Sequence, residues 1–265
     1  MDNRYALILG ASSGFGKAIG LALAKDGVNI IGVHLDRATT MPGVEQLISD
    51  IKAEGVEVHF FNVNAADEEK RTTILDKIKN EIFAGKENSH IKVLVHSLAF
   101  GTLLNFIDDD PKKQITQKQI NMTLDVMACS LVYWSQGVVS NGLMGKGGKI
   151  YAMTSSGGSR QIQYYGAVSA AKACLDSFVR QLAMELAQKG ISVNALKAGV
   201  TNTPALQRIP NADKIIANAI QRNPMHILTD PKDVADFVID NYKIDSHWVT
   251  GNIIGIDGGE SVVEI

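Results

Sequence analysis

The feature that most constrains this chain is a series of short, continuously apolar runs separated by longer stretches with helical periodicity. A strand that is apolar along its whole length is buried on both faces, which is typical of parallel sheets covered by helices. The runs span residues 5–10, 28–33, 56–63, 91–97, 148–155, 192–198 and 252–257. Because helical stretches connect them, we predict the α/β class, with a doubly wound, parallel, seven-stranded sheet and right-handed crossovers.

The composition agrees with a single domain over residues 1–265. Of these residues, 45% are hydrophobic and 20% are charged, which is enough to enclose a full core. A formal net charge of -2 gives no basic surplus, so neither nucleic acid nor a membrane is an expected partner. The chain opens directly on a strand, without room for a signal peptide, and no apolar run reaches the length of a spanning helix. We therefore expect a cytoplasmic protein.

The cysteines and histidines indicate neither a disulfide nor a metal site. Cys129 and Cys174 lie far apart in apolar stretches without CxxC spacing, so we expect buried free thiols in a reducing compartment. The histidines other than His96 have no carboxylate or cysteine partners at ligand spacing, and no metal is assigned. His96 is expected to serve the backbone of its loop and is not assigned as a base.

A glycine-rich turn, GASSGFGKAIG at residues 10–20, follows the first predicted strand and opens a helix. Such a turn lets the backbone approach a pyrophosphate and presents the free N–H groups of a helix N-terminus. In the first strand-to-helix turn of a parallel sheet it predicts a Rossmann-type nucleotide site. The expected contacts come from Gly10, Ser12, Ser13, Gly14, Phe15 and Gly16.

The GxxxGxG spacing of this turn and three later motifs resemble the short-chain dehydrogenase/reductase family. Asn62 and Val63 stand where that family usually has an Asp–Val pair that meets adenine. The segment VNALKAG (193–199) resembles its VNA-x-x-PG segment, and GNIIGIDGG (251–259) resembles its closing strand and turn. The resemblance covers nearly the whole chain and implies an oxidoreductase that binds a nicotinamide dinucleotide.

The stretch QYYGAVSAAK (163–172) departs from the usual Tyr-x-x-x-Lys pattern of that family, because Val168 holds the place of the tyrosine. Valine has no acidic proton to donate. On a helix, Tyr165 and Lys172 are two turns apart and only about 20° from a common face, whereas Tyr164 points roughly 80° away. We therefore predict that Tyr165 works with Lys172, provided that the helix already has regular pitch at residue 165.

The Tyr-x6-Lys spacing is similar to that of the enoyl-acyl-carrier-protein reductases, a subgroup of the family. HSLAF (96–100), Asp125 in DVMACS, and AGVTNT (198–203) resemble segments of the same subgroup. The ordinary glycine loop, and Ser155 in place of a second tyrosine, match the variants that keep both features. The resemblance implies catalytic roles for Tyr165, Lys172 and Ser155, and cofactor contacts from Ser97, Leu98, Ala99, Lys172, Gly199, Val200, Thr201 and Thr203.

This resemblance implies NAD(P)H-dependent reduction of a 2,3-trans-enoyl thioester of acyl carrier protein or CoA in fatty acid synthesis. Tyr165 would donate to the thioester oxygen as negative charge develops there, and Lys172 would hold the nicotinamide ribose and make the phenol more acidic. Two alternatives stay open. One is a carbonyl or alcohol oxidoreductase, such as a 3-oxoacyl thioester reductase, and the other is a non-catalytic dinucleotide-binding regulator, as Val168 suggests.

The segment VHLDR (33–37) bears on the choice of cofactor and gives opposite signals. Asp36 would bind the ribose hydroxyls of NAD, whereas Arg37 would accommodate the additional phosphate of NADP. His34 adds a candidate phosphate donor, and Ser13 replaces an arginine that many NADP-dependent members carry. The balance favours NADP(H) by a small margin and leaves NAD(H) open.

Two further expectations concern a lid and the assembly. Residues 201–224 contain a helix with apolar residues that include Leu206 and Ile215, and we expect a mobile lid over an acyl pocket. The resemblance implies a homotetramer, in which the helices around residues 125–140 and 165–187 pack against a second subunit. Both helices are so apolar that we expect a second buried face on each. The segment SVVEI (261–265) is expected at another interface.

Overall fold

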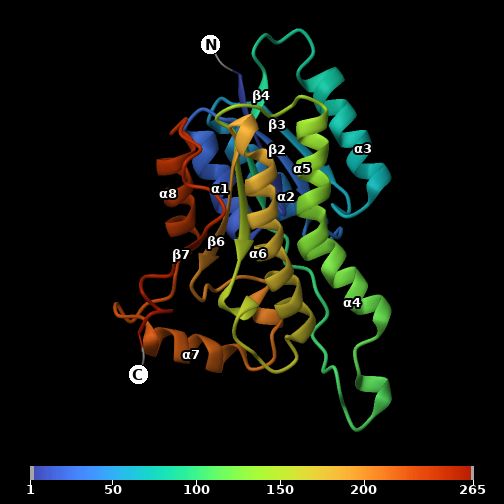
Figure 1. Ribbon diagram of the computed structural model, residues 1–265, viewed down its shortest axis with the longest axis vertical. Helices are drawn as coiled ribbons and strands as arrows, with labels where there is room; N and C mark the ends of the chain where they lie inside the picture. Colours follow the sequence, from blue (N-terminus) through green and yellow to red (C-terminus); the bar gives the residue numbers. More distant parts are fainter. Residues whose placement is uncertain (1–2, 264–265) are drawn as a thin grey trace.

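The computed structural model describes residues 3–263, which fold into a parallel sheet covered by helices on both faces (Figure 1). Within this range the sheet has seven strands in the order β3-β2-β1-β4-β5-β6-β7, and every neighbouring pair is parallel. The strands are β1 (Arg4–Leu9), β2 (Asn29–His34), β3 (Val58–Asn62), β4 (His90–His96), β5 (Lys149–Thr154), β6 (Ser192–Ala198) and β7 (Ile253–Ile256). The predicted α/β class and all seven predicted strands are confirmed.

The helices form two layers, each of which covers one face of the sheet. They are α1 (Gly14–Lys25), α2 (Met41–Ala53), α3 (Glu68–Lys77), α4 (Gln117–Leu124), α5 (Ser130–Ser140), α6 (Gly166–Leu186), α7 (Ala212–Arg222) and α8 (Pro231–Tyr242). The side chains of α3, α5 and α6 pack into one core, and those of α1, α2 and α8 pack into the other. This arrangement is the predicted doubly wound one.

The continuous apolar runs follow from these two cores. In β1, Tyr5, Leu7 and Leu9 belong to the core beneath α5 and α6, whereas Ala6 and Ile8 belong to the core beneath α1 and α8. Successive side chains of a strand point to opposite faces, so a strand between two cores must be apolar at every position.

The candidate site lies at the carboxyl edge of the sheet. The chain runs from β1 outward to β2 and β3, and then returns to place β4 on the other side of β1. Such a reversal leaves a crevice beyond the carboxyl ends of the two diverging strands, which is where ligands bind in this architecture. Figure 1 shows α4 and α7 beyond that edge, at the end of the molecule opposite to the N-terminus.

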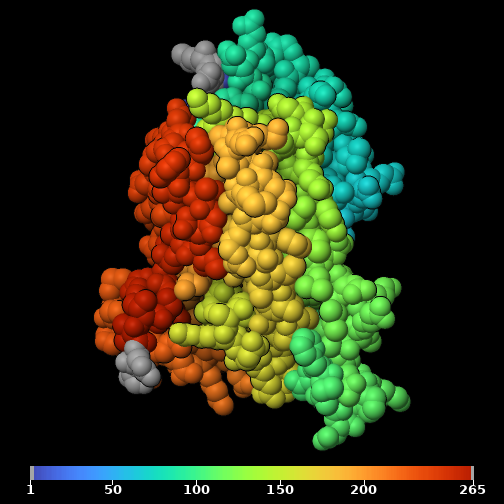
Figure 2. All heavy atoms as spheres, viewed as in Figure 1, coloured from blue at the N-terminus to red at the C-terminus, as the bar shows by residue number. Residues whose placement is uncertain are grey.

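The expectation of a second buried face on α5 and α6 is wrong for most of the residues that suggested it. Within one protomer the structure already buries Val126, Met127, Leu131, Trp134, Val138, Leu175, Val179, Leu182 and Leu186. Val132 and Phe178 are only partly buried. Both helices pack against the sheet and against neighbouring helices of the same layer, so a wide apolar face is used inside the protomer. The outer face of α6 remains open in Figure 2.

Two other features bear on earlier expectations. Cys129 and Cys174 are free thiols, and both are half-buried. Across residues 3–263, no helix combines the length and the hydropathy that a membrane crossing requires.

Candidate active site

The glycine loop after β1 is built so that backbone packs directly on backbone. Gly10 has a φ of +86°, and a Cβ atom there would lie 2.4 Å from the carbonyl oxygen of Ser97. A Cβ atom at Gly16 would lie 2.1 Å from the carbonyl oxygen of Gly10. Larger residues at either position would open the turn, whereas the glycines bring the N-terminus of α1 to the carboxyl edge. Such a cradle fits the pyrophosphate of a dinucleotide.

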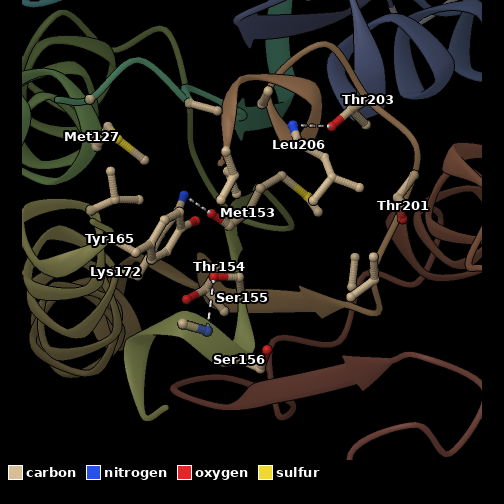
Figure 3. Close-up of a pocket in the computed structure, with 18 of the residues that line it drawn as sticks. Met127, Met153, Thr154, Ser155, Ser156, Tyr165, Lys172, Thr201, Thr203 and Leu206 are labelled. Atoms are coloured by element: carbon tan, nitrogen blue, oxygen red, sulfur yellow. Dashed lines mark hydrogen bonds between the residues drawn. The ribbon is translucent and has the colours of Figure 1, made fainter. Parts of the chain in front are cut away.

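A cavity of about 200 Å³ lies beside this loop, beyond the ends of β4, β5 and β6 (Figure 3). It brings together most of the predicted site residues. Its wall includes Tyr165, Lys172, Ser155, Phe15, Ser97, Leu98, Ala99, Gly199, Val200, Thr201 and Thr203. The other predicted residues lie at or after the ends of β1, β2 and β3, outside this wall: Gly10, Ser12, Ser13, Gly14, Gly16, His34, Asp36, Arg37, Asn62 and Val63.

Tyr165 stands at the N-cap of α6, one residue before the regular helix begins. Its φ of -95° and ψ of 3° are not helical, so the expected regular pitch at residue 165 is wrong by one position. Its carbonyl oxygen nevertheless accepts the N–H of Ser169 at 2.8 Å, which keeps it in the register of the helix. Its side chain lines the cavity. Tyr164 has a φ of +66°, in the left-handed region, and lies outside the cavity wall.

Lys172 is almost fully buried in α6, with 6% of its surface exposed. Its ammonium donates to the carbonyl oxygen of Met153 at 2.6 Å, and Figure 3 shows the Tyr165 ring beside it. Burial lowers the pKa of Lys172 to about 8, and the nearby Asp176 carboxylate opposes that shift. The ammonium is therefore the main form at neutral pH.

The acidity of Tyr165 differs from the expectation. Burial raises its pKa, and the nearby Ser155 hydroxyl acts in the opposite direction without outweighing burial. We expected Lys172 to make the phenol more acidic, but desolvation of the phenolate decides the sign. The phenol is consequently protonated near neutrality and can donate to an oxygen in the cavity.

Ser155 connects the end of β5 to this tyrosine. It stands at the N-cap of a short 3₁₀ turn, and its Oγ accepts the N–H of Gly157 at 3.2 Å. The same hydroxyl lies close enough to the Tyr165 phenol to lower its pKa. The serine can therefore orient the phenol from the strand side.

An apolar wall forms another part of the cavity, and only the residues that it takes from the expected lid were identified in the sequence. It comprises Gly101, Leu103, Met127, Met153, Ile162, Val168, Leu206, Ile209 and Ile215. Val168 is buried, and a Cβ atom at Gly101 would lie 2.7 Å from its Cγ2 atom. Met127 belongs to a π-helical turn, Asp125–Cys129, between α4 and α5. Asp125 begins that turn but lies outside the cavity wall, so the enoyl-reductase resemblance at this position does not place it in the site.

The segment expected to form a lid contributes directly to the cavity wall, through Thr201, Thr203, Ala205, Leu206, Arg208, Ile209 and Ile215. The base of this segment is fixed by Glu260, a residue that the motifs did not identify. Its buried carboxylate accepts the N–H of Val200 at 2.9 Å and pairs with Arg222, the last residue of α7, at 3.0 Å. The C-terminal turn therefore positions both ends of the segment.

The turn after β2 holds Asp36 and Arg37, the two residues that favour NAD and NADP respectively. The Asp36 carboxylate lies 2.9 Å from Nδ1 of His34 and accepts from the Thr40 hydroxyl at 2.8 Å. Burial raises the pKa of Asp36, but the polar groups of Ser12, Thr40 and His34 around the carboxylate lower it overall. The ring of buried His34 is thus committed through Nδ1 to Asp36. Asn62 holds the Asp36 backbone, because its amide accepts from one peptide group of Asp36 and donates to the other. Arg37 extends into solvent.

His96, at the end of β4, is fully buried, and its Nε2 atom lies 2.8 Å from the Ser130 hydroxyl. Burial and the charge of Lys172 lower the pKa of His96 to about 3. The imidazole is therefore neutral and too weak a base to accept a proton near neutral pH. Its hydrogen bond goes to the Ser130 side chain, so the expected contact with the loop backbone is wrong.

A parallel sheet in this order, a glycine cradle at its first turn and a Tyr–Lys–Ser group around a buried lysine define a class of dinucleotide-binding oxidoreductases. A family model described as Enoyl-(Acyl carrier protein) reductase matches residues 10–261. The chain therefore belongs to this enoyl-reductase-like branch of the short-chain dehydrogenase/reductase family. The family resemblance seen in the sequence is confirmed.

Known relatives carry more than one activity. The chain is 25% identical to the 3-oxoacyl-[acyl-carrier-protein] reductase FabG of Thermotoga maritima, over 98% of each chain. A short chain dehydrogenase from Burkholderia cenocepacia in complex with NADP is 24% identical with a TM-score of 0.80, over 98% of this chain and 99% of that one. The enoyl-[acyl-carrier-protein] reductase (NADH) of Aquifex aeolicus is 20% identical, also with a TM-score of 0.80, over 100% and 98%.

Proposed function

We propose that this oxidoreductase reduces a 2,3-trans-enoyl thioester with NAD(P)H. The observation that carries the proposal is the position of the acid: Tyr165 faces the cavity with Lys172 and Ser155, while Val168 forms an apolar wall. The phenol stands at residue 165 and not at residue 168, where the family usually has its tyrosine. This position suits a substrate whose acceptor oxygen is separated from the carbon that receives hydride. An enoyl thioester has that separation, since hydride adds at the β-carbon and charge develops on the thioester oxygen.

In this reaction the cofactor, the phenol, the ammonium and the apolar wall would have separate roles. A bound nicotinamide would supply the hydride, and the glycine cradle around Gly10 and Gly16 has room for its pyrophosphate. Tyr165 would donate a hydrogen bond to the thioester oxygen, where stabilisation of a developing enolate lowers the barrier. Lys172 would hold the ribose hydroxyls with its ammonium and keep positive charge beside the phenol. The apolar wall would exclude water from the acyl chain.

We further propose NADP(H) as the preferred cofactor. The Asp36 carboxylate is already engaged by Thr40 and His34, whereas the guanidinium of exposed Arg37 is available for a 2′-phosphate. The similar structures support a nicotinamide dinucleotide in general, because one is described with NADP and another as NADH-dependent. Residues 201–224 would act as a lid that closes over the acyl chain.

The second candidate is a 3-oxoacyl thioester reductase, which the Thermotoga maritima relative favours. In that reaction Tyr165 would donate to the ketone oxygen on the carbon that receives hydride. The deciding experiment is NADPH oxidation with crotonyl thioester and with acetoacetyl thioester, each on CoA and on acyl carrier protein. Faster turnover of crotonyl thioester supports the proposal, and faster turnover of acetoacetyl thioester replaces it with the second candidate. Tight cofactor binding without turnover of either would indicate a non-catalytic regulator.

The predicted homotetramer is kept as a proposal, with different support. A patch of exposed apolar side chains lies along β7 and the segment before it, where Trp248 is 88% exposed, Val249 63%, Ile244 51% and Ile253 44%. Among the described strands, β7 is the last in the sheet order, so its outer edge can pair with a second copy. Of the segment 261–265, residues 264 and 265 lie outside the described range, and Val262 is exposed.

A further inference from the structure

A second concave region lies at the end of the sheet opposite to the candidate active site. It has a volume of about 840 Å³, and its wall includes Arg4, His90, Lys92, Lys146, Lys243 and Asp245. The sheet register brings these residues together, because Arg4 pairs with His90, and Val93, next to Lys92, pairs with Lys149. The region therefore collects basic residues from the amino ends of β1, β4 and β5.

Lys92 in this wall and Lys149 on the neighbouring strand are both buried, which is unusual for an ammonium group. Lys92 is 7% exposed, and its Nζ atom lies 2.8 Å from the Oδ1 atom of Asp245. Lys149 is 4% exposed and donates to the carbonyl oxygen of Ser246. Burial and the charge of Lys92 lower the pKa of Lys149. Asp245, with a side chain 87% exposed, forms an ion pair with Lys92, and its charge partly opposes the lowered pKa of Lys149.

Helix ends explain only part of this charge. Helices in this fold run antiparallel to the strands, so their negative C-terminal ends lie at the same end of the sheet and attract cations. Lys243 at the C-cap of α8 fits that explanation, and it also pairs with Asp26 at 2.7 Å. Lys92 and Lys149 instead lie within strands, and Lys146 is exposed in the loop before β5. Of these three lysines, Lys92 and Lys146 face the concave region, and buried Lys149 adds positive charge behind it.

We propose that this region binds a phosphorylated metabolite of nucleotide size through a diphosphate group held by Lys92, Lys146 and Arg4. The phosphate oxygens would replace Asp245 on Lys92, because a carboxylate on an exposed segment forms a weak ion pair. Charge-assisted bonds from lysine and arginine to phosphate are stronger. The volume fits a ligand larger than a single ion.

The test is isothermal titration calorimetry of the chain saturated with NADP+ or NAD+, whichever binds more tightly, so that the dinucleotide's own diphosphate site is filled. The probes are inorganic diphosphate and ADP. We expect saturable binding with a dissociation constant below about 1 mM. Tighter binding of ADP would identify a nucleotide as the source of the diphosphate, and tighter binding of inorganic diphosphate would identify a smaller source.

The variants locate the binding. Lys92→Met and Lys146→Ala should each weaken it by about tenfold or more, whereas Lys52→Ala, an exposed lysine of α2, should leave it unchanged. If Lys92→Met fails to fold, Lys146→Ala carries the test, because residue 146 is exposed. Non-saturable heats, or equal affinity in Lys146→Ala and Lys52→Ala, would overturn the proposal. Neither result bears on the thioester chemistry at the other end of the sheet.

Discussion

The ammonium of Lys172 donates a hydrogen bond of 2.6 Å to the carbonyl oxygen of Met153, two residues before Ser155. The bond ties α6 to the end of β5 and so fixes the separation between the lysine, which follows Tyr165 by two turns, and the serine. Because the acceptor is a backbone atom, the position of the ammonium depends on the sheet itself. The three side chains therefore form a unit whose geometry is set by one helix and one strand.

Replacing Tyr165 with phenylalanine should lower kcat by about 100-fold or more, because a donor that acts mainly as charge develops contributes to the transition state. Cofactor affinity, measured by quenching of tryptophan fluorescence, should change little. Tyr164→Phe is the matched control, since its neighbouring phenol lies outside the cavity wall. Equal rates for Tyr165→Phe and Tyr164→Phe would remove Tyr165 from the mechanism.

The pH dependence of activity should report Lys172. Because burial lowers its pKa to about 8, the ammonium is lost as the pH rises above that value. In the unchanged protein we expect kcat/KM to fall above pH about 8. The activity that the Lys172→Arg variant keeps should persist to higher pH, since arginine stays charged. A fall at the same pH in Lys172→Arg would assign the titration to another group.

Lys172 should also affect how the free energy of unfolding depends on pH. Its folded pKa of about 8 lies below its ordinary value of 10.5, so between these values the unfolded chain binds more protons at residue 172. The free energy of unfolding then rises with pH across this window, relative to a chain without the lysine. Urea unfolding at several pH values should show a smaller slope for Lys172→Met. An unchanged slope would mean that Lys172 is not buried as an ammonium.

Arg37→Ala should raise the KM for NADPH by about tenfold or more and leave that for NADH almost unchanged, because only NADPH offers a 2′-phosphate for a charge-assisted bond. Steady-state kinetics with both cofactors measure this. Lys52→Ala serves as a control for the loss of one positive charge elsewhere on the surface. Parallel changes for both cofactors would argue for selection through Asp36.

Glu260→Ala should raise the KM for the cofactor more than it lowers kcat, because Val200 and Arg222 lose their shared acceptor. The melting temperature should also fall, since a backbone N–H and a partly buried guanidinium would be left without this partner. Glu260→Gln keeps an acceptor and should restore most of the cofactor affinity. If glutamine and alanine gave the same KM, hydrogen bonding at residue 260 would not position the loop.

Light scattering at micromolar concentration should give a mass about four times the 28.6 kDa of one chain. Trp248→Glu should reduce that mass, because it places a charge in the exposed apolar patch along β7. A single mass near one chain for the unchanged protein would contradict the tetramer. An unchanged tetramer in Trp248→Glu would place the interface elsewhere.

Much of the fold could be predicted because each strand separates two cores and is apolar at every position. The motif residues of the site could be predicted because they follow strands whose carboxyl ends meet at one edge. The lid residues Leu206 and Ile215 of the apolar wall were expected over the acyl pocket. The rest of the wall could not be predicted, since Gly101 and Met127 come from a loop and a π turn, which lack a regular period. The direction of the pKa shift of Tyr165 could not be predicted from the motifs either, because it depends on burial, which is a property of the assembled cavity.

The contact between Val168 and Gly101 also limits which substitutions the site can accept. The wall at residue 168 closes against Gly101, where even a methyl group would collide with the Val168 side chain. A tyrosine at residue 168 would be larger than the valine and would crowd the backbone at Gly101. Its ring would also occupy part of the cavity beside the ring of Tyr165. A tyrosine at residue 168 alone would therefore not produce the ordinary Tyr-x-x-x-Lys site in this cavity, because the packing around Gly101 and Tyr165 would have to change with it. The position of the phenol makes residues 101, 165 and 168 mutually dependent, so that none of them can be exchanged independently of the other two.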